Sequence, residues 1–96
     1  NILSNQFNIN KIYPNPFNPS TRIVFNIEAQ DDYITQIFNI KGQKVYEVLN
    51  ESLQPGEHTL IWNAKDNYGN KIPSGIYVMK ISNAYVSKQR KLVLMK

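Results

Sequence analysis

His58 is the only histidine of the chain and the first place to look for acid–base chemistry. It alternates with Leu60 and Trp62, a spacing typical of a histidine at the edge of a β core. The chain has no cysteine to act as a nucleophile. Its serines have no partners that sequence can nominate for a catalytic triad. We therefore expect neither a catalytic residue nor a cofactor.

One loop offers the oxygen ligands that a calcium ion accepts. Asp66, Asn67 and Asn70 lie within five residues of one another, together with Gly69. A single carboxylate is too little charge for a strong site, and Asn and Gly are also ordinary turn residues. The sequence therefore favours a plain turn, with calcium binding as the weaker alternative.

Basic residues are concentrated toward the end of the chain. Residues 1–66 contain seven acidic and five basic residues, whereas residues 67–96 contain no acid and six bases: Lys71, Lys80, Lys88, Arg90, Lys91 and Lys96. This asymmetry indicates either an anionic or polar partner or lysines that protect an exposed edge strand from aggregation. No nucleic-acid recognition motif accompanies these residues, so we expect no nucleic-acid partner.

Length and composition indicate one small ordered domain. The chain has 96 residues, of which 42% are hydrophobic and 19% charged. No run approaches the roughly 20 apolar residues that cross a bilayer, so we expect no membrane insertion. The chain begins at Asn1 and with no signal peptide, which we interpret as a processed product or a fragment of something larger.

The hydrophobic pattern predicts an all-β fold with little or no helix. Short runs rich in Ile, Val, Tyr, Phe and Thr alternate with turn-forming residues. Together they predict an Ig-like or fibronectin-III-like antiparallel β-sandwich of about seven strands. The expected strands are Arg22–Glu28, Tyr33–Ile40, Gln43–Leu49, Glu57–Asn63, Ile76–Ser82 and Ser87–Met95, with a possible edge strand near Phe7–Ile12.

Side-chain alternation assigns inner faces to several of these strands. Ile23, Phe25 and Ile27 are expected to face the core with Arg22, Val24 and Asn26 opposite, and Tyr77, Met79 and Ile81 share one face. The run Tyr33–Ile40 breaks the alternation, which indicates a bulge or two-sided burial. Gly42 suits a hairpin turn with positive φ, and Gly75 a bulge or close backbone approach.

The segment from Tyr13 to Thr21 carries three prolines around two aromatic residues. Proline fixes φ and restricts the residue before it, so Pro14, Asn15 and Pro16 predict a stiff lead-in. Phe17, with Tyr13, is then free to plug the end of a core. The last strand, from Lys91 to Met95, is apolar on both faces. It indicates either a contact beyond the domain or burial between a sheet and the N-terminal segment.

Several motifs in order resemble a known family. They are Tyr13 to Thr21, Phe38 to Val45 with Gly42, Pro55 to His58 leading to Trp62-Asn63, Asp66 to Gly69, Ser74-Gly75-Ile76-Tyr77, and Lys91 to Lys96. From about Tyr13 to Lys96 the chain resembles the type A C-terminal sorting domain of type IX (Por) secretion substrates. It is also similar to the Ig-like domain of flagellar hook-capping proteins. Lys41 and Asn63-Ala64 depart from the usual family residues, at strand ends.

The resemblance implies a non-catalytic module at the end of a secreted cargo, which reaches the cell surface or the outside through the periplasm. It implies an outer-membrane translocon, a sortase-like protease and an upstream cargo domain as partners. It also divides the chain into an N-terminal linker or edge segment, 1–12, and a sorting domain, 13–96. The recognition residues that it implies are Gly75, Tyr77, Lys91, Leu92, Val93, Leu94 and Lys96. We expect the basic residues Lys88 and Arg90 of the last strand to belong to the same recognition surface.

A structural role is the alternative. The same sandwich would serve as a stalk, an adhesin or a subunit of an extracellular polymer, with copies pairing through the terminal strand or the segment Asn1–Ile12.

Overall fold

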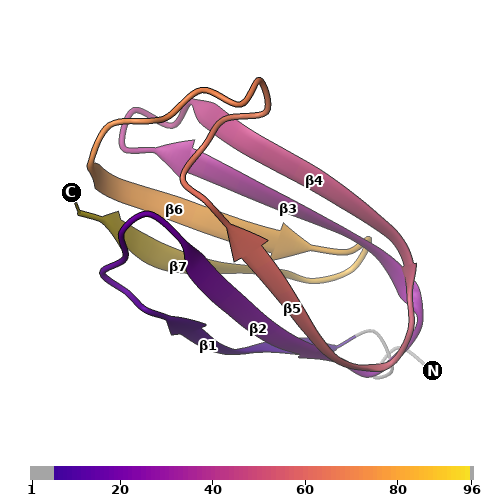
Figure 1. Cartoon of the computed structure of the whole chain (residues 1–96). Coiled ribbons are helices and arrows are strands. Elements are labelled where there is room, and N and C mark those ends of the chain that lie inside the picture. Colours follow the sequence, from indigo (N-terminus) through magenta and orange to yellow (C-terminus); the bar gives the residue numbers. More distant parts are fainter. Residues whose placement is uncertain (1–5, 96) are drawn as a thin grey trace.

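The computed structural model of the chain describes residues 6–95, which form seven β-strands and no helix (Figure 1). None of these residues belongs to a helix that is long and apolar enough to cross a membrane. The strands are β1 (Phe7–Tyr13), β2 (Thr21–Ile27), β3 (Asp31–Asn39), β4 (Lys44–Leu53), β5 (Gly56–Trp62), β6 (Gly75–Ser82) and β7 (Ser87–Leu94).

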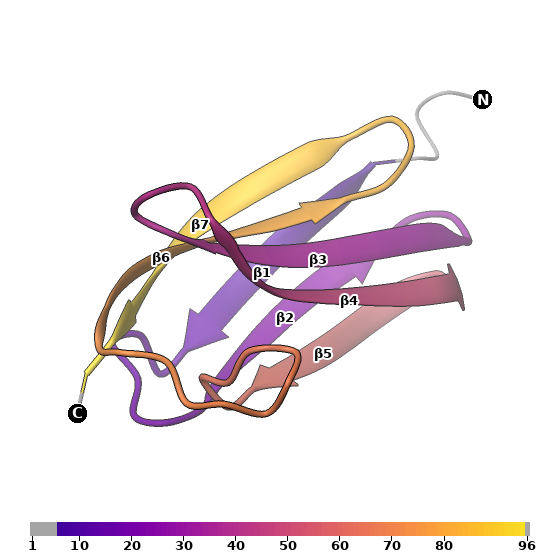
Figure 2. The same ribbon diagram turned by 90° about the horizontal axis from the view of Figure 1, so that it is seen from above.

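The strands form two antiparallel sheets packed face to face, which confirms the predicted β-sandwich. One sheet has the order β1-β2-β5 and the other β4-β3-β6-β7. Figure 2 shows the two layers crossing at an angle, as twisted sheets do when they pack. β1, β3, β5 and β7 run toward the same end of the sandwich, which we call the C-terminal pole. β2, β4 and β6 return toward the opposite pole (Figure 1).

The expected strands are all present, with bounds shifted by a residue or two except at β4. That strand continues to Leu53 because it stays paired with β3 beyond Leu49. Near its end Ser52 takes a φ of 54°, and its N–H donates to Asp32 Oδ1 at 2.8 Å. The irregularity predicted within β3 is confirmed as shifts in the β3–β4 register. A further shift, between Ile9 and Lys11, interrupts the β1–β2 ladder.

The core is made by the inward side chains of both sheets. Alternation is confirmed for Ile23, Phe25 and Ile27 and for Tyr77, Met79 and Ile81, all of which are buried. Val24 was expected on the wet face, yet only 5% of it is exposed. The reason is its place on a central strand, where it is flanked across the two ladders by Lys11 and Thr59.

We expect substitutions on the two faces of β7 to differ in their effect on the free energy of unfolding. Leu92 is fully buried, so Leu92→Ala should lower the free energy of unfolding by about 2–5 kcal/mol. Val93 is half-buried on the outer face, and Val93→Ala should change it by about 1 kcal/mol or less. Urea titrations of both variants give the comparison. Equal losses at the two positions would contradict the assignment of faces.

Candidate functional site

The terminal strand divides its side chains between core and surface. Leu92 and Leu94 are buried, and Tyr77 opposes Leu92 from the inner face of β6. Lys91 is exposed and Val93 is half-buried on the outer face of the four-stranded sheet. Of the residues that the resemblance implies for recognition, Leu92, Leu94 and Tyr77 therefore lie inside the sandwich. Lys96 lies outside the described residues.

The outer edge of β7 is covered by the proline-rich segment. The Asn15 amide binds the strand as a peptide group would: its Nδ2 donates to Lys91 O at 3.0 Å, and its Oδ1 accepts from Val93 N at 2.9 Å. Phe17 N–H donates to Val93 O, and Met95 N–H donates to Phe17 O, both at 2.9 Å. We call residues 15–17 the edge clamp. The clamp covers the edge of β7 but not its outer face, where Val93 stays half-buried.

The ring of Phe17 plugs the C-terminal pole, as the sequence predicts, but the same prediction is wrong for Tyr13, which is 45% exposed. Phe17 is 2% exposed and lies 5.7 Å from the ring of Trp62, which in turn lies 6.0 Å from the rings of Tyr46 and Tyr77. The Trp62 indole donates to Lys65 O at 3.0 Å, so its one polar atom is satisfied. The clamp thus joins the core and the β7 edge in one unit.

Burial also affects the tyrosines of the core. The pKa of Tyr77 is raised above its ordinary value by desolvation, and its hydroxyl donates to Pro73 O at 2.5 Å. Burial likewise raises the pKa of Tyr33, against a hydrogen bond from Asn83 that lowers it. Both phenols are therefore held neutral and serve as structural groups.

The other half of β7 carries inward-pointing charges. Strand alternation places the side chains of Lys88 and Arg90 on the same face of the sheet as Leu92. They lie nearer the start of β7, at the open side of the sandwich next to β1. Lys88 Nζ donates to Asn8 Oδ1 at 3.1 Å and lies 5.7 Å from the centre of the Phe7 ring. Arg90 donates to Gln89 O. Inward charges of this kind discourage another chain from pairing with the edge.

The Asp66 loop is organised as a turn. Asp66 Oδ1 accepts the backbone N–H groups of Tyr68 and Asn70, both at 2.9 Å. Asn67 leaves the loop and binds the free edge of β4, where Glu47 N–H donates to Oδ1 at 2.8 Å and Nδ2 donates to Glu47 O at 2.9 Å. Residues 6–95 contain no group of three or more His, Cys, Asp or Glu side chains that would hold a metal. Asn67 repeats on β4 what Asn15 does on β7.

Two glycines are placed by backbone conformation. Gly42 takes a φ of 81° in the β3–β4 turn, as predicted, and its N–H donates to Asn39 O. Gly75 begins β6 with a φ of 152°. A Cβ at Gly75 would meet no atom within 4 Å, so the predicted close backbone approach is wrong and the backbone angle is what favours glycine there.

His58 lies at the edge of the core, as its spacing predicts. The His58 ring lies 5.7 Å from Phe25 and makes a 2.6 Å hydrogen bond with Gln54 O, at the edge of the core. The pKa of Glu47 is lowered by a hydrogen bond from Lys44 and a second from Gln36, which marks an exposed ion pair on β4.

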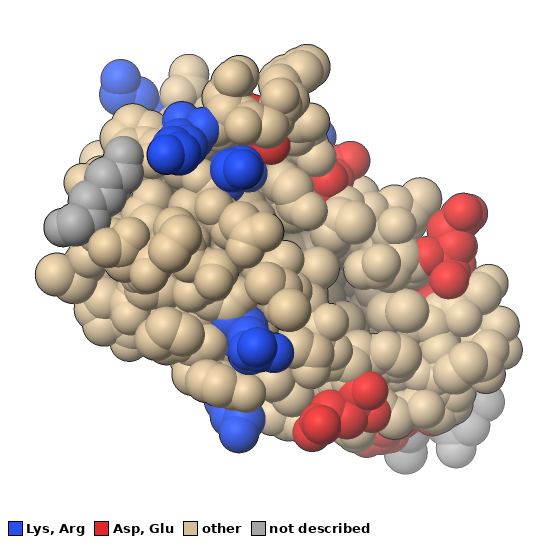
Figure 3. Space-filling view, viewed as in Figure 1, with Lys and Arg blue, Asp and Glu red and all other residues tan. Residues whose placement is uncertain are grey.

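Charge is separated along the long axis of the molecule. Five of the seven acids lie at or near the opposite pole: Glu28, Asp31, Asp32, Glu51 and Glu57. Basic residues occupy the C-terminal pole, with Lys41 in the β3–β4 turn and Lys65 and Lys71 between β5 and β6. Figure 3 shows this separation on one face of the protein.

The two sheets form an immunoglobulin-like β-sandwich. The edge of its C-terminal strand is paired with the edge clamp. The family model described as "Secretion system C-terminal sorting domain" matches residues 11–95. The chain belongs to this family, and the match confirms the resemblance drawn from its motifs. It is a sorting module, and its destination is the cell surface or the outside.

Solved structures with the same fold include two proteins of Porphyromonas gingivalis. The sandwich of latent dimeric PorU from Porphyromonas gingivalis matches with a TM-score of 0.72 and 15% identity, over 93% of this chain and 9% of that one. PorZ from the same organism, a surface component of its type-IX secretion system, matches with a TM-score of 0.61 and 24% identity, over 90% and 11%. At these identities the likeness shows the fold.

The hook-capping protein FlgD from Xanthomonas campestris also shares the fold. It matches with a TM-score of 0.63 and 17% identity, over 91% of this chain and 64% of that one. The chain spans less than two thirds of each of these three proteins. A search of curated protein sequences found no match.

The edge clamp yields a direct prediction. Asn15→Ala removes the amide that pairs with Lys91 and Val93, and we expect a loss of about 1–2 kcal/mol in the free energy of unfolding. It should also free the β7 edge, so light scattering should detect association that grows with concentration. Asn10→Ala, an exposed asparagine on β1, is the matched control and should change neither quantity. Loss of stability without association would mean that another element protects the edge.

The Asp66 loop can be tested for calcium. Asp66→Asn keeps the Oδ1 acceptor but removes the charge, so the free energy of unfolding should change by less than about 1 kcal/mol. Millimolar calcium should leave the thermal midpoint of both proteins unchanged. A rise in the midpoint of the parent protein that Asp66→Asn abolishes would instead establish a calcium site.

Proposed function

We propose that this chain is a non-catalytic sorting module that directs a secreted cargo through the type IX secretion system, and that the translocon recognises the outer face of its β6–β7 hairpin. The family membership supports the first part. The second rests on the division of β7 between core and surface. Because Leu92 and Leu94 are committed to the core, the residues left for a partner on that strand are the outward ones.

The outward residues form a small mixed surface. Ile76, which is 47% exposed, lies directly opposite Val93, and Val78 lies directly opposite Lys91. Three branched apolar side chains and one lysine therefore stand side by side on a rigid hairpin. Lys80 follows on β6, with its Nζ 6.0 Å from the centre of the Phe38 ring. An apolar surface rimmed by lysine suits a partner that presents an apolar face with acidic residues around it.

The position of the chain ends fits this role. β1 begins at the opposite pole from the end of β7, and the protein extends 44 Å along its longest axis (Figure 1). An upstream cargo domain would join at the acidic pole and leave the hairpin accessible to an outer-membrane translocon. A sortase-like protease would then act on the connection to the cargo, on the side of residues 1–12. Passage through the periplasm precedes both steps.

Export of a reporter fused ahead of this chain, in a bacterium with a type IX system, tests the proposal. Lys91→Glu/Val93→Ser alters only outward side chains and should abolish export while the thermal midpoint stays near that of the parent chain. Deletion of residues 90–96 should also abolish export. That deletion removes Leu92 and Leu94 from the core as well, so the double substitution is the sharper test.

A matched control lies on the other sheet. Lys11→Glu/Ile61→Ser changes one exposed lysine and one half-exposed branched residue on the outer face of the three-stranded sheet. This variant should be exported normally. Equal export of the two double variants would refute recognition through the β6–β7 surface, and normal export of the deletion would refute the sorting role itself.

A further inference from the structure

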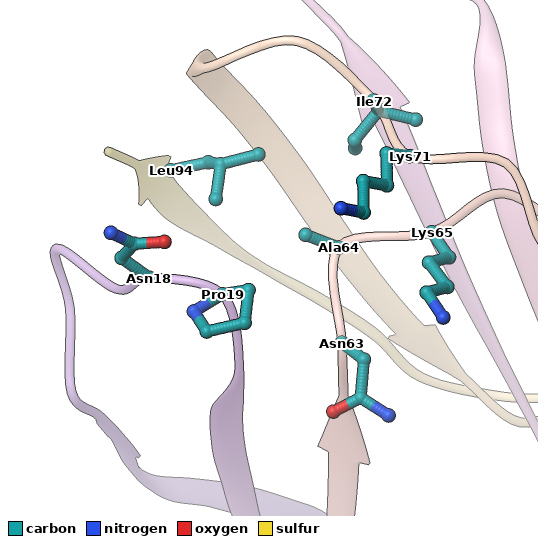
Figure 4. Close-up of a pocket in the computed structure, with 8 residues that line it drawn as sticks. All are labelled: Asn18, Pro19, Asn63, Ala64, Lys65, Lys71, Ile72 and Leu94. Carbon is teal, nitrogen blue, oxygen red and sulfur yellow. The ribbon is translucent and has the colours of Figure 1, made fainter. Parts of the chain in front are cut away.

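A hollow of about 560 Å³ lies at the C-terminal pole, between the β1–β2 loop and the β5–β6 loop (Figure 4). Its floor is apolar and formed by Pro19 with three buried side chains, Ala64, Ile72 and Leu94. The floor continues the core of the sandwich, so it is fixed in shape. None of the outward residues of the β6–β7 hairpin lines the hollow, so it is a separate site.

Two lysines form one wall. Lys65 and Lys71 face each other as an isolated antiparallel β-bridge within the β5–β6 loop. Figure 4 shows Lys71 reaching over Ala64, while Lys65 runs on the other side of it toward Asn63. Like charges placed directly opposite each other across a β pair destabilise it. The two ammonium groups point to different sides of Ala64, and an anion bound at this wall would screen the repulsion between them.

The protein itself does not supply that anion within residues 6–95. The salt bridge found there joins Lys44 and Glu47, and no carboxylate lines the hollow. Asp66 follows Lys65 in the chain, but its Oδ1 accepts the N–H groups of Tyr68 and Asn70. The two lysines are therefore left to bind a group from outside.

The rest of the lining narrows the chemistry of the ligand. Asn18 and Asn63 also line the hollow. A side-chain amide has the donor and the acceptor that suit the N–H and C=O groups of a peptide. No aromatic ring lines the hollow for a sugar to stack on, and no arginine offers the bidentate fork suited to phosphate. An apolar floor below two ammonium groups fits a carboxylate on a short methylene stem.

We propose that this hollow binds a glutamate or aspartate side chain carried by an extended acidic segment of a partner protein. Lys65 and Lys71 hold the carboxylate, the floor packs against the stem, and the two asparagines pair with the peptide backbone. Binding here does not depend on export, so the two can be measured separately.

Titration of the ¹⁵N-labelled full chain with an acetylated and amidated Glu-Ala-Glu peptide, at fixed ionic strength, tests the proposal. The amide signals of Ala64, Lys65 and Lys71 should shift and saturate, whereas the corresponding Gln-Ala-Gln peptide should leave them in place. Lys65→Gln/Lys71→Gln should weaken binding by about tenfold or more, as loss of charged hydrogen bonds does. Both lysines are exposed, and Trp62 fluorescence reports that the variant is folded.

Lys11→Gln/Lys41→Gln, which removes the same charge elsewhere, is the matched control and should bind like the parent chain. In a second measurement Lys71→Glu should raise the thermal midpoint, since it replaces repulsion with attraction to Lys65, and should abolish peptide binding. Equal weakening by the two double variants would reduce the effect to general charge attraction and overturn the site. Tighter binding of inorganic phosphate than of the glutamate peptide, or equal shifts with both peptides, would also overturn it.

Discussion

The pairing of the proline-rich loop with the main chain of the last strand is the constraint on which the rest of the structure depends. Asn15 and Phe17 reach residues more than seventy positions later in the sequence and close the edge of β7 with four hydrogen bonds. The same loop inserts Phe17 against Trp62. An edge that would otherwise invite other strands is thereby paired within the chain, and the core is closed at the same place.

Side-chain amides of asparagine pair with the unpaired backbone groups at both edges of the four-stranded sheet. Asn15 on β7 and Asn67 on β4 each offer one donor and one acceptor in the geometry of a peptide group. A side-chain amide stops a sheet without adding a strand that would itself need a partner. The lysines of the last strand divide accordingly: Lys88 guards the edge near β1, and Lys91 belongs to the outer surface. Lys88 thus fits the interpretation of edge protection, and Lys91 belongs to the surface that we propose for a partner.

Local pattern predicted the strands because each has a half-buried surface that alternation reveals. The β-sandwich and the inner faces of β2 and β6 follow from such patterns, and the role of Phe17 follows from the prolines beside it. The burial of Val24 was not predicted, because it depends on neighbouring strands on both sides. The sequence of one strand does not contain that information. The C-terminal bound of β4 was not predicted, because it depends on a hydrogen bond from Ser52 N–H to Asp32, twenty positions away.

The candidate site was predicted as a set of residues but not as a surface. Composition showed a basic, apolar last strand, and the structure divides that set into Leu92 and Leu94 inside and Lys91 and Val93 outside. The pairing of Asn15 was not predicted, because its partners lie more than seventy positions away in the sequence. The hollow between Lys65 and Lys71 was not predicted either, because it arises from two loops that meet only in the folded chain.

The opposed chain ends and the edge clamp also determine how the domain would respond to mechanical tension. If cargo pulled on the start of β1 while a partner held the end of β7, the load would run along the strands, from one pole to the other. The bonds of Asn15 and Phe17 lie across that line, so they would be sheared together and not peeled apart one after another. Such a geometry resists rupture more than one in which the same hydrogen bonds break one at a time.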